Sequence, residues 1–227
     1  MNKPLIHKFL AKPMTGIEIE QRSFEIIDSE MGPPTVPRDQ WEVIRRMIHT
    51  CGDPGIAPLV RFSTGAIQAG VAALRAGAPL YVDSNMIRSG LSLARLRSVN
   101  PAYSSDRIIC KVAAPDVVAE SKQTGLPRSY FAVRKARATL DGGISVFGNA
   151  PVALLEINRM IAEGELKPAL VIGLPVGFVH VEESKTELLS LPVPSIVMTG
   201  RRGGSTLAVS IVHALCTIAE WTQENAG

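Results

Sequence analysis

The chain has 227 residues, with 24 lysines and arginines against 21 acids, and 46% of its residues are hydrophobic. This length suits one domain with a substantial core, so we expect residues 1–227 to form a single domain. A net charge of +3 with both signs interspersed argues against a nucleic-acid surface. Since no stretch approaches the roughly 20 apolar residues that span a bilayer, we expect neither a nucleic-acid nor a membrane partner.

The cysteines and the N-terminus indicate the compartment. Cys51, Cys110 and Cys216 are scattered, form no metal-binding spacing and suit a reducing cytoplasm. The N-terminus lacks an apolar core long enough for a signal peptide. We therefore expect a cytoplasmic protein without a metal site, in which residues 1–14 form a loosely ordered N-terminal segment.

Helical patterns alternate with short apolar runs along the chain. The helical patterns include Thr15–Glu30, which a capping box opens, and then Asp39–Ile48, Thr64–Arg75, Met86–Ala94, Arg128–Leu140 and Ser205–Trp221. Runs of strand length are Pro79–Val82, Arg107–Val112, Ile144–Phe147, Ala169–Ile172 and Ser195–Met198, and Leu59–Phe62 is a further short extended piece. Apolar strands between helices imply a parallel sheet covered on both faces. We predict an α/β fold: a three-layer, doubly wound, mainly parallel sheet of five strands.

His49 follows the amphipathic stretch Asp39–Ile48, which Gly52 and Pro54 end. The residue therefore lies at a helix C-terminus, where the macrodipole stabilises a protonated imidazolium. Because histidine holds or releases a proton near neutral pH, His49 is a candidate general acid. The alternative is a surface or capping histidine beside a turn.

Polar or glycine-rich residues follow the predicted strands. They are Asp83, Gly148-Asn149, Gly173 with Pro175, and Gly200-Arg201. Because ligands of such folds bind beyond the carboxyl ends of the strands, we expect these residues at one rim. Other interpretations stay open: a strand-to-helix turn at Gly148–Pro151, a surface loop or anion cradle at Gly200–Ser205, and a helix N-cap at Asp83.

Two further side chains are interpreted as structural. Lys185 lies in the acidic stretch Glu182–Glu187 and is expected on an exposed helix face with local ion pairs. His213 lies at the margin of an apolar helix stripe and has no partner in the sequence.

A series of motifs runs from about Glu18 to His213. It comprises Glu18-x-x-x-Arg22-Ser23-Phe24, His49-Thr50-Cys51-Gly52-Asp53-Pro54, Asp83-Ser84-Asn85-Met86, Arg128-Ser129, Gly148-Asn149-Ala150-Pro151, Pro175-Val176-Gly177-Phe178-Val179, Glu183-Ser184-Lys185 and Gly200-Arg201-Arg202-Gly203-Gly204-Ser205. In order and spacing the series resembles the precorrin-8X methylmutase (cobalt-precorrin-8 methylmutase) family of cobalamin biosynthesis.

The resemblance implies a flavodoxin-like homodimer that needs no cofactor. It implies an isomerase that moves a methyl group from C-11 to C-12 of a tetrapyrrole (corrinoid) substrate, precorrin-8X or cobalt-precorrin-8, to give hydrogenobyrinate or cobyrinate. His49 is then the proton donor, and the substrate-binding residues are Ser23, Asn85, Arg128, Ser129, Asn149 and Arg201. The alternatives are a corrinoid carrier without turnover and a phosphometabolite enzyme that uses the Gly200–Ser205 cradle.

Overall fold

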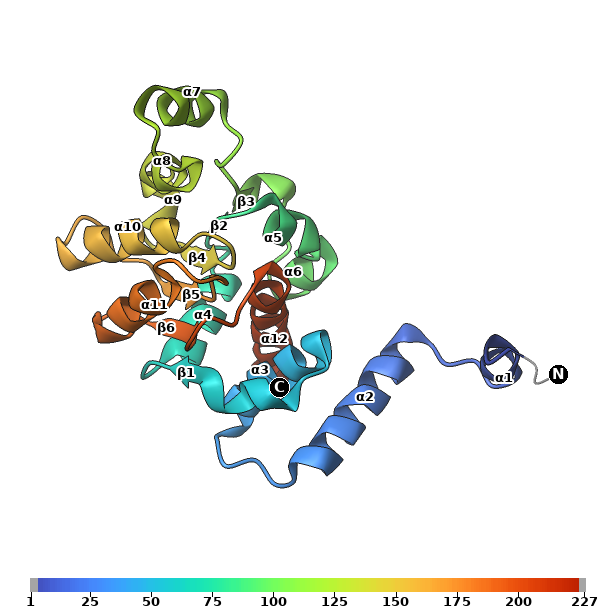
Figure 1. Ribbon diagram of the computed structural model, residues 1–227. Helices are drawn as coiled ribbons and strands as arrows, with labels where there is room; N and C mark the ends of the chain where they lie inside the picture. Colours follow the sequence, from blue (N-terminus) through green and yellow to red (C-terminus); the bar gives the residue numbers. More distant parts are fainter. Residues whose placement is uncertain (1–3, 225–227) are drawn as a thin grey trace.

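A computed structural model describes residues 4–224, with side chains described for residues 4–221. Residues 1–3 of the expected N-terminal segment lie outside the described part. Within that part, six strands form one sheet in the order β1-β6-β5-β4-β2-β3 (Figure 1). The strands are β1 (Val60–Phe62), β2 (Leu80–Val82), β3 (Ile108–Ile109), β4 (Ile144–Phe147), β5 (Leu170–Gly173) and β6 (Ser195–Met198).

The sheet is mixed but mostly parallel. Strands β2 to β6 pair in parallel, as expected for apolar strands separated by helices. Strand β1 pairs antiparallel with β6, with Arg61 opposite Val197. The predicted number of five strands was therefore wrong: the short piece at Leu59–Phe62 joins the sheet as an antiparallel edge strand.

Helices occupy the connections. They are α1 (Ile6–Ala11), α2 (Gly16–Met31), α3 (Arg38–Cys51), α4 (Ala66–Arg75), α5 (Asn85–Gly90), α6 (Leu93–Val99), α7 (Pro115–Thr124), α8 (Arg128–Lys135), α9 (Arg137–Leu140), α10 (Pro151–Ala162), α11 (Val181–Ser190) and α12 (Ser205–Glu224), with 3₁₀ turns at Pro54–Leu59 and Ser105–Arg107. The pattern at Met86–Ala94 predicted one helix where the structure has two. Ser92 separates them because its side chain accepts a hydrogen bond from the N–H of Arg95 and so starts α6.

Helix α2 begins and helix α3 ends as their sequences indicate, whereas α3 begins at Arg38 with Pro37 at the N-cap and no side-chain cap. The Thr15 side chain accepts a hydrogen bond from the N–H of Glu18, and the Glu18 carboxylate accepts one from the N–H of Thr15. This confirms the capping box. Helix α3 ends at Gly52 in the left-handed conformation, with φ of 66°, which glycine adopts without strain. His49 therefore lies in the last turn of α3.

The strands supply alternate residues to two apolar cores. On one face, strand residues such as Val82, Val146 and Ile172 pack with residues of α3, α4 and α12. On the other face, Tyr81 and Phe147 pack with residues of α8, α10 and α11. This alternation follows from the two-residue period of a strand, and helices therefore cover both faces of the sheet (Figure 1).

Helices α1 and α2 form an N-terminal arm that extends away from this body (Figure 1). Helix α2 packs against α3, whereas α1 lies at the far end of the arm, and residues 4–14 are exposed throughout (Figure 1). Among the described residues, no helix combines the length and apolar character needed to cross a membrane.

Candidate active site

A buried carboxylate organises the rim at the carboxyl ends of the strands. Asp83 follows β2, and its side chain accepts hydrogen bonds from the N–H groups of Gly148, Asn149 and Ala150, at 3.1, 2.8 and 2.7 Å. Burial raises the pKa of Asp83 to about 6, against the lowering effect of these bonds. Asp83 does not cap the next helix, because Ser84 accepts the bond from the N–H of Ile87.

The turn after β4 lies directly against the start of α12. A Cβ atom on Gly148 would lie 2.8 Å from the Cα of Ser205, so only glycine permits this contact between backbones. The Ser84 hydroxyl is 3.0 Å from the Ser205 hydroxyl, which ties β2 to the same point. The interpretation of Gly148–Pro151 as a strand-to-helix turn is therefore confirmed. The exposed Asn149 follows Gly148 in this turn and so lies beside the loop after β6.

The loop after β6 contacts the loop after β5 through backbone atoms. The N–H of Gly204 donates to the carbonyl of Leu174 at 2.9 Å, and that of Gly177 donates to the carbonyl of Arg201 at 3.2 Å. The Arg201 guanidinium lies 5.4 Å from the ring centroid of the exposed Phe178. Asn149 and Arg201 thus lie on neighbouring loops of one rim, as predicted.

His49 is held by α2. The Ser23 hydroxyl lies 2.7 Å from Nδ1 of His49, and the Phe24 ring meets the imidazole edge-on with 5.4 Å between centroids. The guanidinium groups of Arg45 and Arg46 lie over the Phe24 ring. The half-buried His49 therefore has one ring nitrogen engaged by a neighbouring helix.

A hollow of about 240 Å³ opens beside His49, and it is lined by Gly16, Ile17, Ile19, Glu20, His49 and Arg95. Glu20 pairs with Arg46 at 2.7 Å and with Arg95 at 3.3 Å. Burial would raise the pKa of Glu20, but these two cations hold it below its ordinary value. No local pattern in the sequence points to Glu20 or Arg95, because Glu20 is 26 residues from Arg46 and 75 residues from Arg95 in the chain.

A second hollow lies between the end of α3 and the start of α12. It measures about 280 Å³ and is lined by Thr50, Met86, Gly90, Ser205, Thr206, Val209, Ser210 and His213. Thr50, which follows His49, and Met86, which follows Asn85, therefore line the same cavity as the start of α12. His213 accepts a hydrogen bond from the N–H of Ser92 at 3.0 Å, and burial lowers its pKa to about 4. This neutral acceptor confirms the structural interpretation of His213.

The remaining predicted residues are more dispersed. Asn85 is the exposed first residue of α5. Arg128 and Ser129 begin α8, which packs on α7 and α10 on the opposite side of the molecule from α2 (Figure 1). In the described part of the chain, no group of three His, Cys, Asp or Glu side chains is placed to hold a metal ion.

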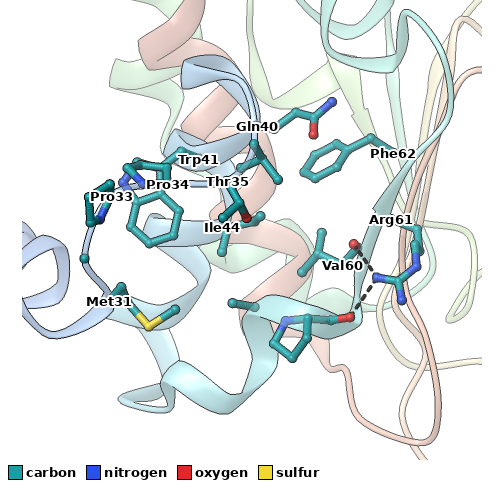
Figure 2. A pocket seen from close by; sticks show the side chains of 14 residues that line it. Met31, Pro33, Pro34, Thr35, Gln40, Trp41, Ile44, Val60, Arg61 and Phe62 are labelled. Carbon is teal, nitrogen blue, oxygen red and sulfur yellow. Dashed lines mark hydrogen bonds between the residues drawn. The ribbon is translucent and has the colours of Figure 1, made fainter.

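A further hollow, of about 370 Å³, lies between α3 and β1. Figure 2 shows the side chains of Trp41 and Ile44 on one side and Val60 and Phe62 on the other. Arg61 donates to the carbonyls of Pro58 and Val60 there (Figure 2). None of the predicted site residues is in its described lining, so we place the candidate site elsewhere.

These features define a single-domain α/β protein with a polar rim at the ends of parallel strands and a histidine beside it. The precorrin-8X methylmutase family model matches residues 18–218. A cobalt-precorrin-8 methylmutase of Priestia megaterium is 41% identical over 211 residues, which are 92% of each chain. A precorrin-8X methylmutase of Pseudomonas aeruginosa is 40% identical over 207 residues, covering 90% of this chain and 97% of the relative.

The crystal structure of a precorrin-8X methylmutase from Thermus thermophilus is 44% identical, with a TM-score of 0.83, and the match covers 91% of this chain and 98% of the other. The chain belongs to the precorrin-8X methylmutase family. It is therefore an isomerase of cobalamin biosynthesis that shifts a methyl group, and the resemblance in the motifs is confirmed.

The raised pKa of Asp83 predicts a pH dependence of folding stability. The pKa of Asp83 in the folded protein, about 6, lies above its ordinary value of about 4. This group therefore contributes stability that is fully present below about pH 4 and is lost as the pH rises through 6. Asp83→Asn removes that dependence. The free energy of unfolding of both proteins is measured with urea between pH 4.5 and 7.5. The wild type minus variant difference in this free energy should be larger at pH 4.5 than at pH 7.5. A difference in unfolding free energy that is the same at all pH values would contradict the raised pKa of Asp83.

Proposed function

We propose that His49 donates the proton that assists migration of the methyl group from C-11 to C-12 of precorrin-8X or cobalt-precorrin-8. The observation that carries the proposal is the 2.7 Å contact between the Ser23 hydroxyl and Nδ1 of His49. This contact fixes the imidazole and leaves Nε2 as the nitrogen that meets the substrate. Protonation of a ring nitrogen redistributes the π electrons of the macrocycle, which lowers the barrier to the shift.

The reaction needs no net redox change. The bond between C-11 and the methyl carbon breaks and the bond to C-12 forms. The ring nitrogen then returns its proton to His49, so that hydrogenobyrinate or cobyrinate results as an isomer of the substrate. Ser23 acts in this proposal by orienting His49, beyond the polar contact to substrate that the sequence suggested. Half-burial of His49 beside Phe24 supports the proposal, because it limits the water that competes for the proton.

The substrate carries many peripheral carboxylates, and the rim offers partners for them. In our proposal Arg201 and Asn149 bind them on the loops after β6 and β4, and Asn85 does so at the start of α5. Arginine binds carboxylates with charge-assisted, often bidentate hydrogen bonds. Arg128 and Ser129 bind the part of the macrocycle farthest from His49. The exposure of Asn85, Asn149 and Arg201 supports these roles.

We also propose that the fold is the three-layer, flavodoxin-like variant. When β2 to β6 are counted in chain order, their spatial order is 2-1-3-4-5. This order is the flavodoxin one, and the covering of both sheet faces by helices supports the same assignment. The unpaired Cys51, Cys110 and Cys216 support a reducing, cytoplasmic location.

A homodimer formed through the N-terminal arm is a further part of the proposal. Leu5, Ile6, Phe9 and Leu10 on and beside α1 are exposed, as are Ile17, Ile19 and Ile26 on α2. So many exposed apolar side chains on one segment are typical of an interaction site. The partner we propose is a second copy, with residues 4–14 contributing to the interface.

Replacement of His49 tests the proton-donor role. His49→Ala should lower the rate of methyl migration by about 10²–10⁴-fold, the range expected for loss of a general acid, with little change in corrinoid affinity. The rate is followed as a change in the visible spectrum of precorrin-8X, and affinity as quenching of Trp41 and Trp221 by hydrogenobyrinate. Lys122→Ala is the control, because Lys122 is an exposed residue on α7, outside the candidate site and the proposed interface. A His49→Ala protein with turnover close to wild type would rule the role out.

Light scattering tests the homodimer. The wild type should elute at twice the 24.3 kDa mass of one chain. Ile17→Glu with Ile26→Glu should give a monomer, because both side chains are exposed in the single chain and charges there oppose burial in an interface. Leu126→Glu, at an exposed leucine outside the arm, is the control and should stay dimeric. A wild-type monomer at micromolar concentration would contradict the proposal.

A further inference from the structure

Lys185 is buried in a helix whose acidic sequence predicts exposure. Glu182, Glu183 and Glu187 of α11 are exposed, but Lys185 retains 1% of its accessible surface. The expectation of an exposed lysine with local ion pairs was therefore wrong. Burial lowers the pKa of Lys185 to about 8, so the protein bears the cost of removing a charge from water. Since burial of this charge is unfavourable, other contacts of Lys185 must compensate for it.

The ammonium group of Lys185 binds the loop after β6. Nζ donates to the carbonyl oxygen of Gly200 at 2.8 Å and to that of Arg202 at 2.7 Å. These carbonyls flank Arg201 on both sides, so one side chain fixes the backbone before and after it. Hydrogen bonds from a charged donor are about twice as strong as neutral ones.

The same loop contacts each neighbouring loop of the rim. The carbonyl of Arg201 accepts from the N–H of Gly177, and the Arg202 guanidinium pairs with Asp53, four residues after His49. A Cβ atom on Gly203 would lie 2.2 Å from the carbonyl oxygen of Leu174. The position of residues 200–203 therefore affects the loop after β5 and the end of α3 together.

We infer that Lys185 is a positioning residue for corrinoid binding: by holding the carbonyls of Gly200 and Arg202, it fixes Arg201 where the guanidinium meets a substrate carboxylate. The inference rests on the proposed function for the role of Arg201. Lys185 itself is covered by the loop and does not touch the substrate. Its loss should therefore weaken binding and leave the proton transfer at His49 intact.

The experiment uses Lys185→Met, which keeps the length of the side chain and removes its donors. Native trypsin digestion, read by mass spectrometry, should cut after Arg201 and Arg202 about tenfold faster than in the wild type, because two charge-assisted bonds no longer oppose loop opening. Cleavage after the exposed Arg128 should not change and serves as the internal standard. The dissociation constant for hydrogenobyrinate should rise several-fold, with kcat within about twofold of the wild type.

The matched control is Lys122→Met, at an exposed lysine on α7, which should match the wild type in all three measurements. If Lys185→Met does not fold, as judged by circular dichroism, Lys185→Gln replaces it, and the same changes are expected in smaller degree. Unchanged cleavage after Arg201 and Arg202, or faster cleavage with unchanged affinity, would overturn the inference. A wild type that binds no corrinoid contradicts the proposed function instead, while cleavage still decides whether Lys185 holds the loop.

Discussion

The geometry of the rim depends on one buried carboxylate between two parallel strands. Asp83 follows β2, and its oxygens accept three backbone N–H groups from the turn after β4. These N–H groups belong to the turn that leads into α10, whose first residue is Pro151. The turn held in this way lies against Ser205 through Gly148, which places the loop of Arg201 beside Asn149. The segments that follow β2, β4 and β6 are therefore held in one arrangement.

The rim contains two buried groups of opposite charge, Asp83 and Lys185, whose charged forms are destabilised by burial. Burial raises the pKa of Asp83 and lowers that of Lys185, so each group loses part of its preference for the charged form. Both side chains make their hydrogen bonds to backbone groups of loops. Because backbone contacts fix these loops, the side chains of Asn149 and Arg201 stay at the surface, where Arg201 lies 3.6 Å from the Glu182 carboxylate.

The sequence predicted the fold in outline, because strand and helix periods and caps such as that at Thr15 are local signals. It failed where the cause is distant in the chain. The antiparallel pairing of β1 depends on β6, and Lys185 is buried only because the loop of Arg202 covers it. The motifs indicated His49 and Ser23 separately, but their contact follows from the packing of α2 on α3.

Membership in the precorrin-8X methylmutase family establishes the class of reaction, and we propose His49, held by the Ser23 hydroxyl, as its proton donor. The most direct test is a crystal structure with hydrogenobyrinate bound. We expect the C-11 to C-12 edge of the macrocycle to face His49, with a ring nitrogen about 3 Å from Nε2 and Nδ1 still bound to Ser23. A corrinoid in the hollow between α3 and β1 (Figure 2), or one whose reacting edge lies away from His49, would contradict the proposal.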